Sequence, residues 1–138
     1  MWTRLLTAAT LIGVGALLAA CGEEAVAVPA ASQGQVVLID EAQAAALRDD
    51  GALVLDVRTQ EEYREGHVIG AQHVPLEDPE LWEQRVAALD PDRTVVVYCR
   101  TGRRSAEAAQ LLVERGFGEV YDAGGIVDFT EGVLPLDR

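Results

Sequence analysis

Residues 94–104 read TVVVYCRTGRR, and this stretch decides the fold. Its first part, residues 94–98, is a run of β-branched and aromatic side chains, which predicts a buried central strand. A loop from Cys99 to Arg104 follows, and the pattern then becomes helical from Ser105 to about Arg115, where Gly116 is placed to end the helix. A strand that leads through a short loop into a helix is the repeating unit of a parallel sheet.

The same alternation continues on both sides of this stretch. Further strands are predicted at residues 36–39, 52–56, 71–74 and 119–122. Helix starts are predicted after Asp40, after Thr59 for a short helix over 61–65, and at Asp78-Pro79, with a last helical turn after Gly124-Gly125. In the first helix, Ala42, Ala45 and Ala46 are expected to face the core. The sequence therefore predicts an α/β fold whose parallel sheet is covered by helices.

Composition limits the class of protein. A chain of 138 residues that is 49% hydrophobic can form one compact domain with a buried core. All eleven basic residues are arginine, so lysine Schiff bases, lysine general bases and phosphate loops that end in Gly-Lys-Ser/Thr are excluded. A net charge of -12 argues against nucleic acid as the partner, because that binding depends on basic groups that neutralise phosphates.

Residues 1–20 have the layout of a secretory signal. One positive charge at Arg4 precedes an uncharged, largely apolar run that ends before Cys21 and is shorter than the ~20 residues that a spanning helix needs. The stretch Leu18-Ala19-Ala20-Cys21 resembles the lipobox of bacterial lipoproteins, in which the signal is cut before a cysteine that receives a diacylglycerol. This resemblance implies that Cys21 is lipidated and that the protein is exported and anchored by lipid to the bacterial cell envelope, on its periplasmic or extracellular face.

The segment after the signal is expected to be a tether. Residues 21–34 lack helical or strand periodicity and are rich in Ala, Gly, Pro and Ser, so a flexible linker is predicted, with the folded domain at residues 35–138. An acylated Cys21 cannot form a disulfide. Cys99 is then a single free thiol in a compartment that oxidises thiols, which calls for an explanation.

The position of Cys99 predicts reactivity. It follows the central strand, and ligands of parallel sheets bind at the carboxyl ends of the strands. The helix after the loop offers free backbone amides and a partial positive charge, which favour the nucleophilic thiolate. Arg100, Arg103 and Arg104 reverse the local charge of an acidic domain, and Gly102 allows the loop amides to turn toward the sulfur. The alternative is a buried core cysteine beside an exposed arginine-rich turn.

Across about residues 35–131, the sequence resembles a single-domain rhodanese, which is a sulfurtransferase. The segments that carry the resemblance are residues 55–59 (LDVRT) with Glu62-Tyr63, 66–71 (GHVIGA), 98–105 (YCRTGRRS) and Gly124-Gly125-Ile126. The resemblance implies a rhodanese-like five-stranded parallel sheet flanked by helices, with Cys99 as the catalytic residue that opens a six-residue loop. Two positions depart from the family pattern: Phe129 replaces a common Trp, and His73 occupies a position that is often Asn.

The resemblance also implies a reaction. The Cys99 thiolate would attack the outer sulfur of a donor anion such as thiosulfate, release sulfite, and hold the sulfur as a persulfide until a thiol or cyanide accepts it. Arg100 and Arg104 would pair with the donor's sulfonate oxygens. The candidate substrate-binding residues are Arg100, Thr101, Gly102, Arg103, Arg104, Ser105 and Arg58. Asp56 and Arg58 lie at the end of the second predicted strand, where a structural ion pair among Arg58, Glu62 and neighbouring residues is favoured over a catalytic role. Neither a cofactor nor a metal is expected, and His67 and His73 are interpreted as structural.

Two alternatives stay open. A phosphatase or arsenate reductase on the same scaffold needs an arginine at position 105, where this chain has Ser105. A persulfide carrier or an interaction module that serves one partner protein would use the same loop. The intact Cys99 with its arginines argues against an inert module and leaves the carrier open.

Overall fold

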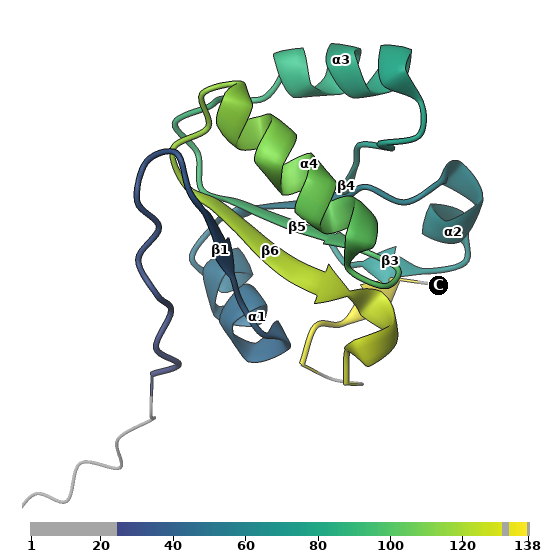
Figure 1. Ribbon diagram of the computed structural model, residues 1–138. Helices are drawn as coiled ribbons and strands as arrows, with labels where there is room; N and C mark the ends of the chain where they lie inside the picture. The colour runs from purple at the N-terminus through teal and green to yellow at the C-terminus, as the bar shows by residue number, and fades with distance from the viewer. Residues whose placement is uncertain (1–24, 131–132, 138) are drawn as a thin grey trace, which may run out of the picture.

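The computed structural model describes residues 25–130 and 133–137, so the expected signal at residues 1–20 and Cys21 lie outside the described residues. The central sheet has five strands in the order β1-β6-β5-β2-β4, and every neighbouring pair is parallel (Figure 1). The strands are β1 (Val36–Leu38), β2 (Leu53–Asp56), β4 (Gln72–His73), β5 (Val95–Cys99) and β6 (Val120–Gly125). The predicted five-stranded parallel sheet is confirmed.

Helices cover both faces of this sheet. In the described residues, the α-helices are α1 (Glu41–Asp49), α2 (Gln60–Arg64), α3 (Pro79–Ala87) and α4 (Arg103–Glu114). Figure 1 shows α3 and α4 above the sheet and α1 on the opposite side. Both faces of β5 are fully buried, with Val97 in the core under α3 and α4 and Tyr98 in the core on the α1 side. None of the described helices is long and apolar enough to cross a membrane.

The three helix starts predicted from capping residues are confirmed. The side chains of Asp40, Thr59 and Asp78 accept hydrogen bonds from the backbone amides three residues later, at 2.8, 3.3 and 3.0 Å. The inner face predicted for α1 is partly wrong, because Ala44 is the buried residue and Ala42 is exposed. Alanines stand at four of the positions 42–46, so the hydrophobic pattern cannot define one face there.

Some small elements have no counterpart in the sequence prediction. A second sheet pairs β3 (His67–Val68) with β7 (Leu136–Asp137) in antiparallel fashion. Strands of two residues are too short to show alternation. By contrast, the helical turn predicted after Gly124-Gly125 is confirmed as the 3-10 turn η1 (Ile126–Asp128). In addition, α4 begins at Arg103, two residues before the predicted start.

Residues 27–35 pack against the domain, and we call this segment the strap. The amide of Gln43 in α1 donates to the Ala27 carbonyl at 2.7 Å, and the Ala31 N–H donates to the Tyr121 hydroxyl at 3.1 Å. Val28 and Ala31 contact the core cluster on the α1 side of the sheet. The sequence predicts that the folded domain begins at Gln35. In the structure, the packed part of the chain begins earlier, with the strap.

Candidate active site

Cys99 is the last residue of β5, at the carboxyl end of the central sheet. Its side chain is 0% exposed, yet the sulfur does not face only hydrocarbon, because the Gly102 N–H donates to Sγ at 3.0 Å. This loop amide lies at the start of α4, whose unpaired N–H groups and partial positive charge favour an anion. The expected position of Cys99 between the strand end and the helix start is thus observed.

The surroundings of Cys99 favour its thiolate. Burial works to raise the pKa of the Cys99 thiol, but hydrogen bonds from the backbone amide and hydroxyl of Ser105 and from the backbone amides of Gly102 and Thr101 together lower it by more. The resulting pKa lies below the ordinary thiol value of 9.0. Because the thiolate is the nucleophilic form of cysteine, the loop holds the sulfur in a state suited to attack.

Gly102 sets the shape of the loop. It caps α4 with a φ of 95° in the left-handed region, which glycine adopts without steric cost. The side chain of Ser105, which is fully buried, donates to the Gly102 carbonyl at 3.0 Å and to the Gly124 carbonyl at 3.4 Å. Two of the predicted site residues, Gly102 and Ser105, therefore stabilise the backbone conformation of the loop.

The Gly124-Gly125 segment supports the loop from the neighbouring strand. Cys99 pairs in register with Gly125. A Cβ atom on Gly125 would lie 2.6 Å from the Arg100 carbonyl oxygen and 2.7 Å from the Thr101 Cα, a distance that real contacts do not show. The Val127 N–H donates to the same Arg100 carbonyl at 3.2 Å. Only a glycine at position 125 lets the loop backbone lie this close to β6.

Arg104 is held by carboxylates and is not free for an anion. Its guanidinium donates to both oxygens of Glu62, at 2.7 and 2.8 Å, and reaches Glu77 at 3.4 Å. The Arg104 side chain is 12% exposed. From the sequence, Arg104 is expected to pair with the sulfonate oxygens of the donor. In the structure, its guanidinium is instead bound by two carboxylates, which neutralise its charge.

Glu62 is positioned for this contact by the start of α2. Its carboxylate accepts from the Thr59 N–H at 3.0 Å while the Thr59 side chain accepts from the Glu62 N–H, which is a capping box. Hydrogen bonds from Arg104, together with the bond from Thr59, outweigh the opposing effect of burial and lower the pKa of Glu62 to about 2. This link from α2 to the loop has no local signal in the sequence, which favours an ion pair of Glu62 with Arg58 and its neighbours.

Arg58 lies in a buried network away from solvent. It is 5% exposed and pairs with Asp56, with an Nη2 to Oδ2 distance of 2.6 Å. Its Nη2 also donates to the Gly66 carbonyl at 2.7 Å. The Tyr98 hydroxyl donates to Asp56 at 2.6 Å and accepts from the Val68 N–H at 3.0 Å. Arg58 is therefore removed from the candidate substrate-binding residues. The favoured structural ion pair of Arg58 is observed with its neighbour Asp56, whereas Glu62 pairs with Arg104.

The remaining loop side chains face solvent. Arg100 and Thr101 are exposed, and the Arg103 side chain is 78% exposed, with only Glu107 within ion-pair range at 4.0 Å. Within the described residues, no carboxylate lies within 4.0 Å of the Arg100 guanidinium. Arg100 is thus the loop arginine whose charge is not neutralised by a neighbouring acid.

The two histidines lie on either side of Tyr63. The ring centroid of Tyr63 is 3.7 Å from that of His67 and 4.6 Å from that of His73. The His67 ring contacts the Tyr63 carbonyl at 3.0 Å, and the His73 ring contacts the Arg58 carbonyl at 2.8 Å. Among the described residues, no group of three or more His, Cys, Asp or Glu side chains is arranged to hold a metal ion.

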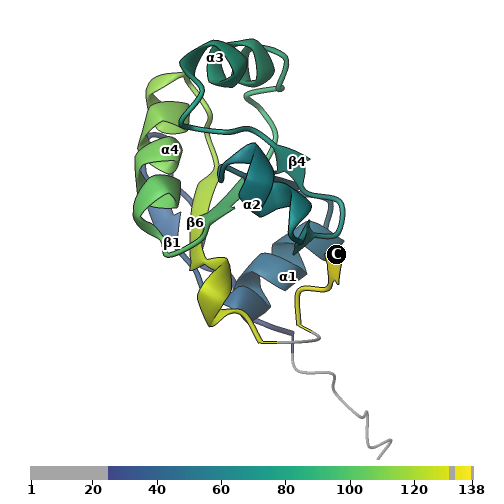
Figure 2. The ribbon, with the colours of Figure 1, turned by 90° about the vertical axis from the view of Figure 1, so that its right-hand side faces the viewer.

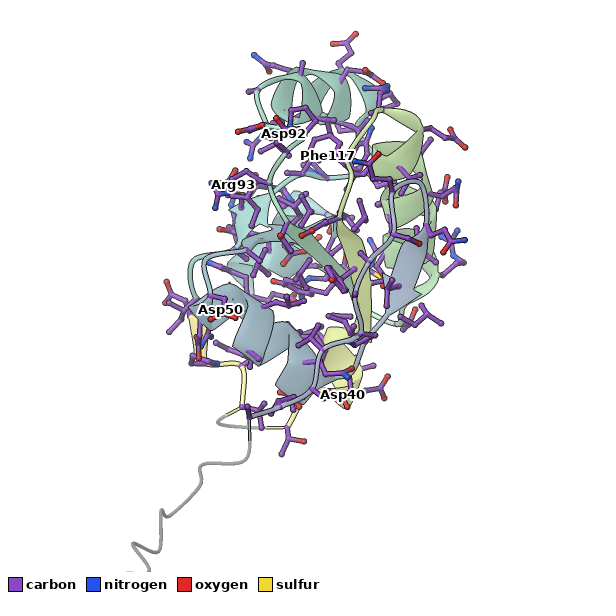
Figure 3. All side chains as sticks on the ribbon, turned by 90° about the vertical axis from the view of Figure 1, so that its left-hand side faces the viewer. Asp40, Asp50, Asp92, Arg93 and Phe117 are labelled. Atoms are coloured by element: carbon purple, nitrogen blue, oxygen red, sulfur yellow. The ribbon has the colours of Figure 1, made fainter. Side chains whose placement is uncertain are left out.

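A groove of about 510 Å³ lies at the opposite end of the molecule from Cys99. It is lined by residues that precede β1, β5 and β6, among them Gly34, Asp92 and Phe117. Figure 3 shows Asp92 and Phe117 together at this end, far from Asp40, which follows β1. The groove therefore lies away from Cys99, whose sulfur is contacted by backbone amides of its own loop.

Comparisons with known proteins agree with this geometry. Residues 40–131 match the family model of the rhodanese-like domain. The chain is 42% identical over 94 residues to the thiosulfate sulfurtransferase GlpE of Pseudomonas fluorescens, a match that covers 68% of this chain and 84% of the relative. It is also 42% identical over 78 residues to the thiosulfate sulfurtransferase PspE of Escherichia coli, covering 55% of this chain and 72% of the relative.

A solved structure agrees as well. The rhodanese with anions from E. coli superposes with a TM-score of 0.55 at 36% identity, over 64% of this chain and 99% of that one. The family model covers well over half of the residues, and the catalytic-loop pattern lies inside the matched range. The chain therefore belongs to the rhodanese-like domain family.

Proposed function

We propose that the protein is a sulfurtransferase that moves sulfane sulfur from a donor such as thiosulfate to a thiol or cyanide through a persulfide on Cys99. The single observation that carries this proposal is the contact of the Cys99 sulfur with loop amides, which lower the pKa of a fully buried thiol. The relatives named thiosulfate sulfurtransferases support the same reaction.

The transfer has two displacement steps on sulfur. In the first, the Cys99 thiolate forms a bond to the outer sulfur of thiosulfate, the bond between the two donor sulfurs breaks, and sulfite leaves with the electron pair. In the second, the acceptor nucleophile bonds to the outer persulfide sulfur, and the Cys99 thiolate leaves. No external oxidant or reductant is consumed. A covalent intermediate between two half-reactions gives ping-pong kinetics.

The loop amides and Arg100 supply the electrostatic stabilisation in this scheme. The amides stabilise the anionic sulfur before and after transfer, as preorganised donors do in oxyanion holes. Arg100, which has no ion-pair partner among the residues that the structure describes, pairs with the donor's sulfonate. Arg104 is a positioning residue, since its guanidinium already donates to Glu62 and Glu77.

We also propose that the domain is exported and attached to the cell envelope through a lipidated Cys21. The support is the sequence before Cys21, where an apolar run ends in Leu18-Ala19-Ala20. Two or three acyl chains suffice to hold a soluble domain at a membrane, at about 0.8 kcal/mol per buried CH₂. Cys21→Ala in the full chain should move the protein from the membrane fraction to the soluble fraction without loss of activity. A variant that still sediments with membranes would rule out this anchor.

The test of the transferase is steady-state kinetics with thiosulfate and cyanide as the varied substrates. Parallel lines in double-reciprocal plots are expected for the unchanged protein and for Cys21→Ala, and no turnover is expected for Cys99→Ser, which retains the fold. Turnover of Cys99→Ser at the unchanged rate would reject the assignment. Formation of a Cys99 persulfide without release to cyanide or small thiols would favour the persulfide carrier, and hydrolysis of a phosphate ester would favour the phosphatase.

A further inference from the structure

The strap determines where the anchored end of the chain leaves the domain. Ala27 is bound by Gln43, in the first turn of α1, and this turn directly follows Asp40 at the carboxyl end of β1. Ala31 then contacts Tyr121 within β6, and Gln35 enters β1 at the amino end of the sheet. The strap therefore runs antiparallel to β1, and its first residue lies at the carboxyl end of the sheet, which is also the end of Cys99.

Figure 2 shows this arrangement directly. The start of the strap, η1 and the first turn of α4 all lie at the lower end of the molecule in that view. The contact of Val127 in η1 with the Arg100 carbonyl places η1 beside the catalytic loop. The chain therefore leaves the domain at the same end of the sheet as the Cys99 loop. We call the outer side of this loop its mouth.

The distance from the proposed anchor to this end is short. Between Cys21 and Ala27 the chain has only six peptide units, which span at most about 20 Å when fully extended. A free linker as long as residues 21–34 would have allowed the domain to turn in any direction. With residues 27–35 attached to the domain, a lipid at Cys21 keeps the carboxyl end of the sheet near the bilayer.

Exposed apolar side chains gather at this same end. Five large apolar side chains are exposed in the part of the chain that the structure describes, and four of them belong to this end: Val26, Leu38, Val127 and Val133. We call these four residues the apolar rim. Leu38 is 75% exposed at the end of β1, and Val127 is 59% exposed next to the loop. Exposed apolar groups on one side of a soluble domain indicate an interaction surface.

We propose that the apolar rim faces the lipid surface to which Cys21 is attached, so that the mouth of the Cys99 loop opens toward the membrane. This proposal rests on the lipid anchor proposed above. A lipid surface fits better than a soluble protein partner because the anchor and the strap already hold the rim within the reach of the six peptide units. Sulfur acceptors would then approach along the membrane surface, as a membrane-attached thiol does.

The test uses two fluorescent labels on the full, lipidated chain in phosphatidylcholine vesicles that carry a headgroup quencher. Val127→Cys and Asp92→Cys are each labelled in a Cys99→Ser background, so that one thiol reacts; Val127 is at the rim, and Asp92 is exposed at the opposite end (Figure 3). Severalfold stronger quenching at position 127 than at position 92 is expected. Equal quenching, or stronger quenching at position 92, would overturn the proposed orientation.

A second variant separates the orientation from the anchor. A flexible Gly-Ser insertion between Ala25 and Val26 leaves both Cys21 and the strap contacts in place, and it should reduce the difference in quenching between the two labels. Flotation with the vesicles reports the anchor independently. If the protein without the insertion floats and its two labels do not differ, the orientation fails while the anchor stands. If it does not float, the anchor and the orientation both fail.

Discussion

Glu62 and Arg104, 42 residues apart in sequence, form a two-point ion pair at 2.7 and 2.8 Å that links the first turn of α2 to the first turn of α4. The pair stands beside the catalytic loop, and the charge of Arg104 also interacts with the Cys99 thiolate. Glu62 therefore both fixes one side of the loop and reduces the positive charge that Cys99 experiences.

Replacement of Glu62 by Gln should lower the pKa of Cys99. Without the Glu62 carboxylate, only the more distant Glu77 at 3.4 Å offsets the charge of Arg104, and a nearby positive charge favours the thiolate. The pH dependence of Cys99 alkylation by iodoacetamide measures this shift. Glu77→Gln is the control, because Glu77 lies at 3.4 Å from Arg104 and its side chain is 52% exposed. Equal alkylation midpoints in the two variants would contradict this role of Glu62.

The same pair predicts a pH dependence of stability. The pKa of Glu62 is lowered from 4.5 to about 2 by its bonds to Arg104 and Thr59, so its contribution is complete above pH 4.5 and is lost as the pH falls toward 2. The free energy of unfolding should decrease more steeply over this interval in the unchanged protein than in Glu62→Gln. At pH 7, Glu62→Gln should cost about 1–2 kcal/mol. Parallel curves in urea titrations at several pH values would refute the assignment.

Substitution of Gly125 by Ala should disturb the loop. The new Cβ would lie 2.6 Å from the Arg100 carbonyl oxygen, so the loop backbone has to move, at a cost of about 1–3 kcal/mol for overpacking. We expect at least a tenfold loss of kcat/KM and a higher pKa of Cys99, because the loop amides no longer converge on the sulfur. Gly118→Ala, where the nearest atom is 3.9 Å away, is the matched control and should change neither. Normal kinetics in Gly125→Ala would show that the close approach has no role in activity.

The elements that carry a strong local pattern could be predicted from the sequence. The buried run of β5, the capping residues Asp40, Thr59 and Asp78 and the glycine after α4 depend on neighbours within a few residues, and all of them were found. The position of Cys99 at the strand end also followed from this order of elements.

Long-range contacts could not be predicted in the same way. Glu62 lies in a motif that contains several charged residues, and nothing local shows that its partner is Arg104 instead of Arg58. The packing of the strap depends on Tyr121, which is 90 residues away from Ala31. The composition of residues 21–34 indicated flexibility, and hydrogen bonds from distant side chains override that tendency within the strap.

Arg100 and Arg103 should differ in their effect on donor binding. Arg100→Ala should raise the KM for thiosulfate severalfold, and raise it more than the KM for an uncharged donor of sulfane sulfur, since a charged hydrogen bond to the sulfonate is lost. Arg103→Ala is the matched control, because Arg103 is 78% exposed and paired with Glu107 across one helical turn. If both variants raise the KM for the two donors equally, Arg100 does not bind the sulfonate.

The most direct test of the account is mass spectrometry of the intact protein after exposure to thiosulfate. We predict a gain of one sulfur atom, located on Cys99 by peptide fragmentation, lost on addition of cyanide, and absent from Cys99→Ser. An unchanged mass, or a gain that persists in Cys99→Ser, would contradict the claim that the amide-bound sulfur of Cys99 carries the transferred atom.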